Sequence, residues 1–124
     1  MGTRFLCAEE CTVHENYKAK ILKAGDLSTA VTGKRLGHPV RSLRTPFARE
    51  YIKLEYSDTP DEVLEEMGIG TLRKAVVDGN LKEGTFLSGQ IAAMVNKEQP
   101  AAEIIKEVVE EAEPILLGAS KWVK

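Results

Sequence analysis

Three side chains near the start of the chain are of types that bind metals. Cys7, Cys11 and His14 follow one another as C-x3-C-x2-H. A closed structural zinc site needs four such ligands, and the chain offers no fourth at a useful spacing. We therefore expect Cys7 to pack as a small hydrophobic residue, and we predict no metal site.

A second group of side chains, in the stretch GKRLGHPVRSLR, is basic. Positive charge there could attract an acidic carrier protein or the phosphates of a nicotinamide cofactor. Charges on an edge strand also prevent edge-to-edge pairing, and this solvated edge is the interpretation we favour. The residues are Lys34, Arg35, His38, Arg41 and Arg44.

The composition excludes several classes of protein. The 124 residues carry a net charge of −2, whereas a general nucleic-acid binder should be strongly basic. No apolar run approaches the roughly 18 residues that span a bilayer, and the first residues lack a secretory signal. Two cysteines do not form a disulfide framework, so we expect a cytoplasmic protein.

The first half of the chain is predicted to contain a strand, a helix and a β-hairpin. Residues 2–7 have the apolar character of an interior strand. Thr12 and Glu15 fit a capping box, which begins a helix that stops near Gly25. β-prone residues flank a turn at 33–35 and predict a hairpin over residues 28–43, in which Pro39 restricts one strand to an edge.

The second half is predicted to be helical. Thr45-Pro46 begins one helix, and Thr59-Pro60 begins another, with a capping box and a left-handed cap at Gly68. Short helices follow over about 72–78 and up to about residue 96. The last helix opens at Pro100, and a kink or restart is expected at Pro114. Its apolar positions form one stripe: 104, 108, 112, 115, 119 and 122.

These elements are too few for a complete domain. One strand and one hairpin make a poor sheet, and an interior strand needs neighbours that this chain does not supply. The stripe of the last helix also needs a surface to cover it. We therefore expect the chain to be part of a larger protein.

The order and spacing of several stretches resemble one flavin enzyme family. These stretches resemble the C-terminal part of the FMN-dependent enoyl-acyl-carrier-protein reductase II and nitronate monooxygenase (2-nitropropane dioxygenase) family. They are, in order, MGTRFLCAEEC with HENYKAKILKA, GHPVRSLRTPFAREY, and the region from MGIGTLRK to VVEEAE. Of the two subgroups, the reductase is the closer one in the sequences GHPVR and GQIAAMV. The resemblance implies an α/β fold: the last strand and closing helix of a (β/α)8 TIM barrel, with an inserted, mostly helical small domain containing a β-hairpin. It implies three segments, with residues 1–25 as barrel strand and helix, 26–87 as the inserted domain and 88–124 as helices on the barrel.

The resemblance also implies site residues. The stretch at Met1, Gly2 and Thr3 would lie against the FMN phosphate, with the Gly2 and Thr3 amides and the Thr3 hydroxyl as donors; the alternative is ordinary strand residues. The turn Ser88-Gly89-Gln90 would face the flavin or substrate, with Gln90 as a cofactor contact; equally, Ser88 could be a helix N-cap. The family's catalytic histidine lies upstream, so no catalytic residue is assigned to this chain.

The implied activity belongs to a larger protein. An FMN-dependent oxidoreductase would either reduce a 2-enoyl thioester with NAD(P)H or oxidise a nitronate with O2, and this chain alone would be inactive. Its partners would be a small-molecule or acyl-thioester substrate and an acyl carrier protein, with neither nucleic acid nor membrane. The alternative is a truncated, non-catalytic binding or oligomerisation module that pairs with itself or with a partner. The exposed first strand and the uncovered stripe of the last helix would then form its interface, with the first strand as the route to a homo-oligomer.

Overall fold

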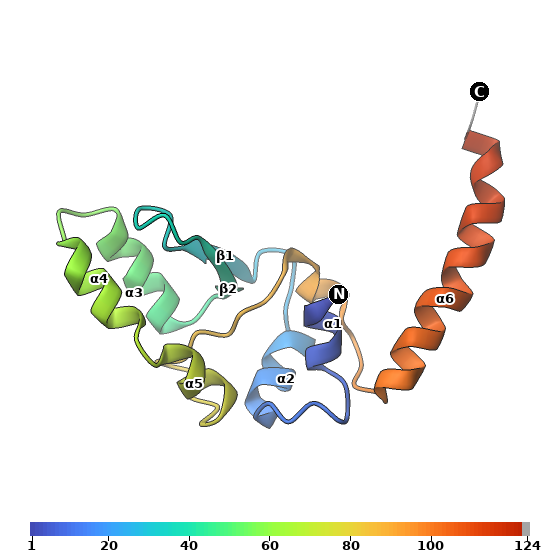
Figure 1. The fold of residues 1–124 in the computed structure, drawn as a ribbon, viewed down its shortest axis with the longest axis horizontal. Helices are drawn as coiled ribbons and strands as arrows, with labels where there is room; N and C mark the ends of the chain where they lie inside the picture. Colours follow the sequence, from blue (N-terminus) through green and yellow to red (C-terminus); the bar gives the residue numbers. More distant parts are fainter. Residues whose placement is uncertain (123–124) are drawn as a thin grey trace.

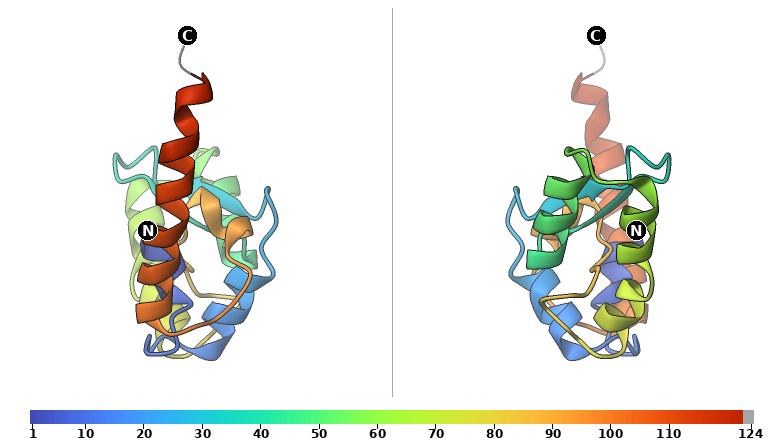
Figure 2. Two further views of the ribbon diagram at one scale, coloured as in Figure 1. Left: turned by 90° about the vertical axis from the view of Figure 1, so that its right-hand side faces the viewer. Right: turned by 90° about the vertical axis from the view of Figure 1, so that its left-hand side faces the viewer.

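The computed structural model describes residues 1–122, and its longest helix extends beyond the other elements (Figure 1). The first group consists of α1 (Gly2–Leu6), α2 (Glu15–Leu22) and the 3-10 helix η1 (Gln90–Met94). The second contains the hairpin strands β1 (Thr29–Thr32) and β2 (Val40–Leu43) with α3 (Pro46–Glu55), α4 (Asp61–Gly68) and α5 (Thr71–Val76). The helix α6 (Ala101–Gly118) contacts α1 through its first turns, where Arg4 lies 4.0 Å from Glu107. The rest of α6 and the 3-10 helix η2 (Ala119–Trp122) extend away from both groups (Figures 1 and 2).

One buried core joins the two groups. Tyr17 and Ile21 from α2 pack with Leu43 at the end of β2, Ala75 of α5 and Phe86 from the following loop. Cys7, Ala92 and Val95 complete the cluster, so it draws on all three predicted segments. The predicted packing of Cys7 in the core is confirmed, since its side chain is fully buried. The boundaries at 25 and 87 remain a prediction, and residues 123–124 of the last segment lie outside the described part of the chain.

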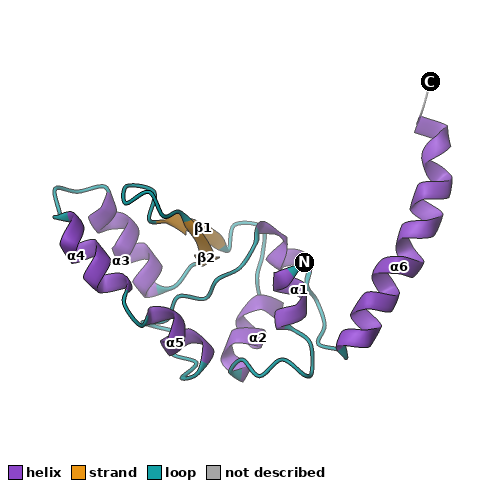
Figure 3. Cartoon of the chain, viewed as in Figure 1, coloured by secondary structure: helices purple, strands orange, loops and turns teal. Residues whose placement is uncertain are grey.

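The predicted hairpin is confirmed as a two-stranded antiparallel sheet (Figure 3). Thr29 pairs with Leu43 and Thr32 with Val40. Gly33 follows β1 with φ +75°, and a Cβ placed there would lie 2.5 Å from the His38 carbonyl oxygen. The turn therefore needs glycine at this position, both for the left-handed backbone and for the close approach.

The predicted strand at residues 2–7 is wrong, because Gly2–Leu6 forms the helix α1. A short apolar run is compatible with either structure, and the surroundings decide between them. Here no neighbouring strand is present among residues 1–122, and Leu6 packs against the core from the helix. The chain becomes extended only at Ala8, which forms an isolated parallel bridge with Gln99. A homo-oligomer through an exposed first strand therefore has no strand on which to form.

Several helix ends differ from the local prediction. The capping box at Thr12 is wrong: His14 is the N-cap of α2, and its Nδ1 accepts a hydrogen bond from the Asn16 N–H at 3.1 Å. The backbone of His14 is held to the end of α5, because its N–H donates to the Val76 carbonyl at 2.8 Å. Thr45 caps α3 as predicted, accepting from the Ala48 N–H at 3.1 Å.

The start and end of α4 also differ from the prediction. Its N-cap is Pro60, whose side chain has no polar atom with which to cap the helix, and the Thr59 hydroxyl is instead hydrogen-bonded to the Ser57 hydroxyl. The left-handed glycine after α4 is Gly70 rather than Gly68. Gly68 instead remains within the last turn of the helix.

The last helix begins directly after Pro100, which is its N-cap, and it runs through Pro114 to Gly118 without a restart. Of its apolar side chains only Ile104 is buried, and Ile115, Leu116 and Leu117 are each about 70% exposed or more. Beyond Ile104, the predicted stripe thus lacks a covering surface within residues 1–122. No helix in this part of the chain combines the length and apolarity needed to cross a bilayer.

Candidate functional site

The two stretches singled out in the sequence meet at the start of α1. The backbone N–H of Gly89 donates a 2.8 Å hydrogen bond to the Thr3 hydroxyl oxygen, across 86 positions of sequence. Gly89 lies directly before η1, and Gln90 is the first residue of that helix. Met1, Gly2 and Gln90 are exposed and Thr3 is half-buried, so this junction is open at the surface.

The N-terminus of α1 has the donor chemistry of an anion site. The first amides of a helix have no intrahelical acceptor, and no side chain caps this helix. Its first turn contains no acidic residue. A Cβ built on Gly2 would meet nothing within 4 Å, so the backbone there is accessible to a ligand. Because the Thr3 oxygen already accepts from Gly89, its hydroxyl hydrogen is available to donate.

Tyr17 fixes the turn that carries Gly89. Its hydroxyl donates to the Leu87 carbonyl at 2.7 Å, and its ring lies 4.9 Å from that of Phe86. Burial raises the pKa of Tyr17 to about 12, which keeps the hydroxyl protonated as a donor. On the other side, the Ser88 N–H donates to the Arg41 carbonyl at 3.1 Å. The turn is therefore held from α2 and from the hairpin at once.

Ser88 does not cap the following helix. Gly89 is the N-cap of η1 without a side-chain bond, and the Ser88 hydroxyl bonds to the Gly89 carbonyl at 3.3 Å. The N-cap interpretation of Ser88 is thus wrong. The sequence also indicated only packing for Tyr17, and its polar role was missed because its acceptor lies 70 positions away.

A buried lysine joins α2 to the chain on either side of the site. Lys18 is 8% exposed, and its ammonium group donates to the Ala8 carbonyl at 2.7 Å and to a Glu98 carboxylate oxygen at 2.5 Å. These contacts link the segment after α1 to the segment before α6. No sequence pattern indicated this pair, because its members are 80 positions apart.

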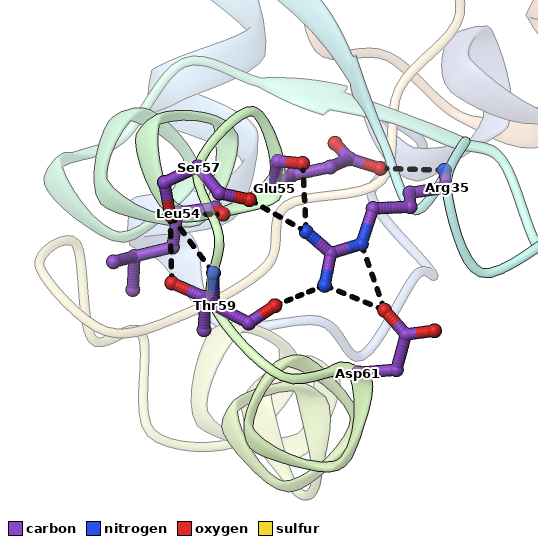
Figure 4. Close-up of polar contacts among 6 residues, drawn as sticks. All are labelled: Arg35, Leu54, Glu55, Ser57, Thr59 and Asp61. Atoms are coloured by element: carbon purple, nitrogen blue, oxygen red, sulfur yellow. Dashed lines mark hydrogen bonds and ion pairs between the residues drawn. The ribbon is translucent and has the colours of Figure 1, made fainter.

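The predicted basic group does not act as one surface. Arg35 is committed to the loop between α3 and α4, where its guanidinium contacts the carbonyls of Glu55, Ser57 and Thr59 and pairs with Asp61 at 2.5 Å (Figure 4). Its backbone N–H also donates to the Glu55 carboxylate at 3.0 Å. Arg35 therefore stabilises the α3–α4 loop, which neither interpretation of the sequence anticipated.

The remaining members of the group lie nearer the hairpin. The Arg41 guanidinium donates to the Thr29 hydroxyl at 2.9 Å, and Arg44 donates to the Thr29 carbonyl at 3.2 Å. Lys34 and His38 are exposed, as are Arg35 and Arg44, whereas Arg41 is half-buried. Four of the five residues therefore have the solvated character that we favoured, although Arg35 and Arg44 also donate hydrogen bonds to the chain.

The cysteines and histidine of the first motif serve separate purposes. Burial raises the pKa of the Cys7 thiol, which disfavours a reactive thiolate. Cys11 is half-buried, and the His14 ring is occupied as a helix cap. Within residues 1–122, no three side chains of the metal-binding types gather in a way that could hold an ion.

Comparison with known proteins places these features in a family. The family profile for nitronate monooxygenase matches residues 1–111. A probable nitronate monooxygenase of Staphylococcus saprophyticus is 30% identical over 118 residues, which are 94% of this chain and 32% of that protein. The (3aS,4S,5R,7aS)-5-hydroxy-7a-methyl-1-oxo-octahydro-1H-indene-4-carboxyl-CoA dehydrogenase of Mycobacterium tuberculosis is 28% identical, with 100% of this chain and 45% of that protein covered.

Solved structures show the same relationship. FabK from Thermotoga maritima matches 99% of this chain and 39% of its own, at 41% identity and a TM-score of 0.92. A mutant form, M276A, matches at a TM-score of 0.81 and 39% identity, over 99% of this chain and 36% of that one. The chain thus spans less than half the length of each of these relatives, and the predicted likeness to part of a (β/α)8 enzyme is confirmed.

Proposed function

Because this chain belongs to the nitronate monooxygenase family, whose members are flavin-dependent oxidoreductases, we propose that it forms part of an FMN-dependent oxidoreductase and contributes one side of the FMN phosphate site. The observation that carries this proposal is the hydrogen bond between Thr3 and Gly89, which joins the two predicted cofactor stretches. The activity belongs to the complete enzyme, and the chain alone is proposed to be inactive.

The residues at the start of α1 fit a phosphate group. The Gly2 and Thr3 amides, together with the Thr3 hydroxyl, would donate to its oxygens, and the positive end of a helix favours an anion. Met1 would lie beside the phosphate and Gln90 beside the isoalloxazine or the substrate. When bound, FMN supplies the electron transfer between the two substrates, and the protein orients it.

We propose reduction of a 2-enoyl thioester as the reaction. NAD(P)H would give up a hydride, and the carbon–carbon double bond would gain that hydride and a proton. Two observations support this choice over the alternative: the identity is higher to FabK than to the probable nitronate monooxygenase, 41% against 30%, and another relative is named for a CoA substrate. An acyl carrier protein is the proposed carrier of the thioester.

Oxidation of a nitronate by O2 is the second candidate reaction, and the family match favours it. A non-catalytic binding module is the alternative from another class. The exposed apolar side chains of α6 support that alternative, since they would suit a partner surface. Light scattering after size exclusion separates the cases: a specific dimer favours the module, and a well-behaved monomer speaks against it.

A hybrid enzyme tests the proposed function. The matching 39% of Thermotoga maritima FabK would be replaced by this chain, and the hybrid assayed for FMN binding, for NAD(P)H oxidation with a 2-enoyl-CoA, and for O2 uptake with a nitronate. We expect FMN binding and thioester-dependent oxidation. We also expect Thr3→Val to weaken FMN binding about tenfold, because it removes a hydrogen bond to a charged group.

The control for the hybrid is Thr12→Val, at an exposed position away from the site. A hybrid that folds but binds no FMN would contradict the phosphate assignment. Equal FMN affinity in the Thr3→Val and Thr12→Val hybrids would show that the Thr3 hydroxyl does not contact the phosphate. For the isolated chain, tight and stoichiometric FMN binding would refute the claim that the rest of the enzyme is needed.

A further inference from the structure

A pocket of about 830 Å³ lies where α2 and the loop after it face the end of β2 and the start of α3. Figure 2 shows this loop projecting at one side of the molecule. Lys20 comes from α2, Lys23 caps its C-terminus, Arg44 follows β2 and Arg49 lies on α3. None of the proposed FMN contacts lines this pocket, so it is separate from the junction of α1 and η1.

The charge of the pocket is strongly one-sided. Four cationic side chains line it against one carboxylate, that of Asp26, which gives a net charge of +3. Among residues 1–122 none of the four cations forms an ion pair. This contrasts with the chain as a whole, whose net charge is −2.

The cations also oppose one another. Burial lowers the pKa of Lys20, and the charge of Arg49 lowers it further. An anion between the two side chains would relieve this repulsion, and a concave site with few competing carboxylates strengthens the attraction. The Arg44 side chain donates a 3.2 Å hydrogen bond to the Thr29 carbonyl through Nε, which leaves the other guanidinium N–H groups as donors for an anion.

The same pocket offers apolar surface. Leu43 is buried at its base, whereas Leu27 is 85% exposed on the loop and Leu81 is 44% exposed on the opposite side. An apolar side chain as exposed as Leu27 beside a concave surface suits contact with a flat or aliphatic group. A simple inorganic anion would leave this part of the pocket unused.

We propose that this pocket binds an organic diphosphate, such as the diphosphate part of a nucleotide. Its phosphates would lie among Lys20, Lys23, Arg44 and Arg49, and its apolar part against Leu27 and Leu81. A terminal phosphate carries about −1.5 to −2 at pH 7, so a diphosphate, with one more ionised group, matches the charge of +3 better than a monophosphate does. The inference stands independently of the proposed FMN site.

Titration of the chain with ADP, followed by amide NMR and calorimetry, tests this assignment. We expect saturable binding at one site, with shifts confined to residues 19–28, 43–49 and the surroundings of Leu81. Pyrophosphate and AMP should each bind at least several-fold more weakly, because each lacks part of the ligand. The double variant Lys20→Gln/Arg49→Gln should weaken ADP binding by tenfold or more.

The matched control is Lys53→Gln, which removes an exposed cation from the same helix as Arg49 but outside the pocket. It should leave ADP binding unchanged. An equal loss in the control and the double variant would overturn the proposal, because it would show general attraction to positive charge. Absence of saturable shifts would overturn it as well, and pyrophosphate binding as tight as ADP would overturn the role of Leu27 and Leu81.

Discussion

Replacement of Tyr17 by phenylalanine removes one hydrogen bond and keeps the packed ring. The hydroxyl donates to the Leu87 carbonyl at 2.7 Å, and the residue is 2% exposed. The ring would still pack against Phe86, so most of the apolar burial is preserved. The loss is therefore that of one hydrogen bond to a half-buried acceptor, which costs about 1–2 kcal/mol in the free energy of unfolding.

The same substitution changes how stability depends on pH. The pKa of Tyr17 is raised by burial from 10.0 to about 12. Its contribution is fully present below pH 10 and is lost as the pH rises toward 12, because the unfolded chain ionises first. At 1.36 kcal/mol per unit, this contribution amounts to about 2–3 kcal/mol. Tyr17→Phe should lack it, so the two proteins should converge in stability at high pH.

Urea unfolding at pH 8 and at pH 11, followed by circular dichroism, measures both effects. With a typical slope of about 1–3 kcal/mol per molar urea, Tyr17→Phe should lower the midpoint by about 1 M at pH 8. Tyr56→Phe is the matched control, since Tyr56 is 71% exposed. If Tyr17→Phe unfolds at the same urea concentration as this control at pH 8, the assigned hydrogen bond does not stabilise the turn.

Two further substitutions test contacts near the site. Gly79→Ala should destabilise the chain by about 2 kcal/mol or more in urea unfolding, because φ is +58° and the added Cβ would overlap the His14 ring. The control is Gly118→Ala, in open space at the end of α6, which should be neutral or stabilising. Equal effects of the two substitutions would contradict the close contact between Gly79 and His14. Lys18→Met should lower the free energy of unfolding by about 1–3 kcal/mol, since it leaves the Ala8 carbonyl without its donor and Glu98 without its partner. Unchanged protection of the nearby amides from hydrogen exchange would argue against a role of Lys18 in joining these segments.

The sequence was most informative where a structural feature depends on neighbouring residues. The hairpin follows from β-prone residues around Gly33, and the start of α3 follows from Thr45 and Pro46. Turns and caps of this kind are decided by side chains within a few positions, so local rules recover them. The family resemblance was likewise readable from order and spacing, and residues 1–111 match the family profile.

Residues 2–7 show where local reasoning fails. Their apolar character suits a strand or a helix, and only the packing of Leu6 on the core selects the helix α1. The cap at His14 shows the same limit, because its ring fits against Gly79 far along the chain. In both places tertiary contacts outweigh a weak local preference.

The candidate site itself was decided by tertiary structure. The sequence identified Thr3 and Gly89 separately, but their hydrogen bond spans 86 positions. The support from Tyr17 and the pair of Lys18 with Glu98 join segments 70 and 80 positions apart. No periodicity or spacing encodes such pairs, since they form only when the buried core brings α1, α2 and the loop before η1 together.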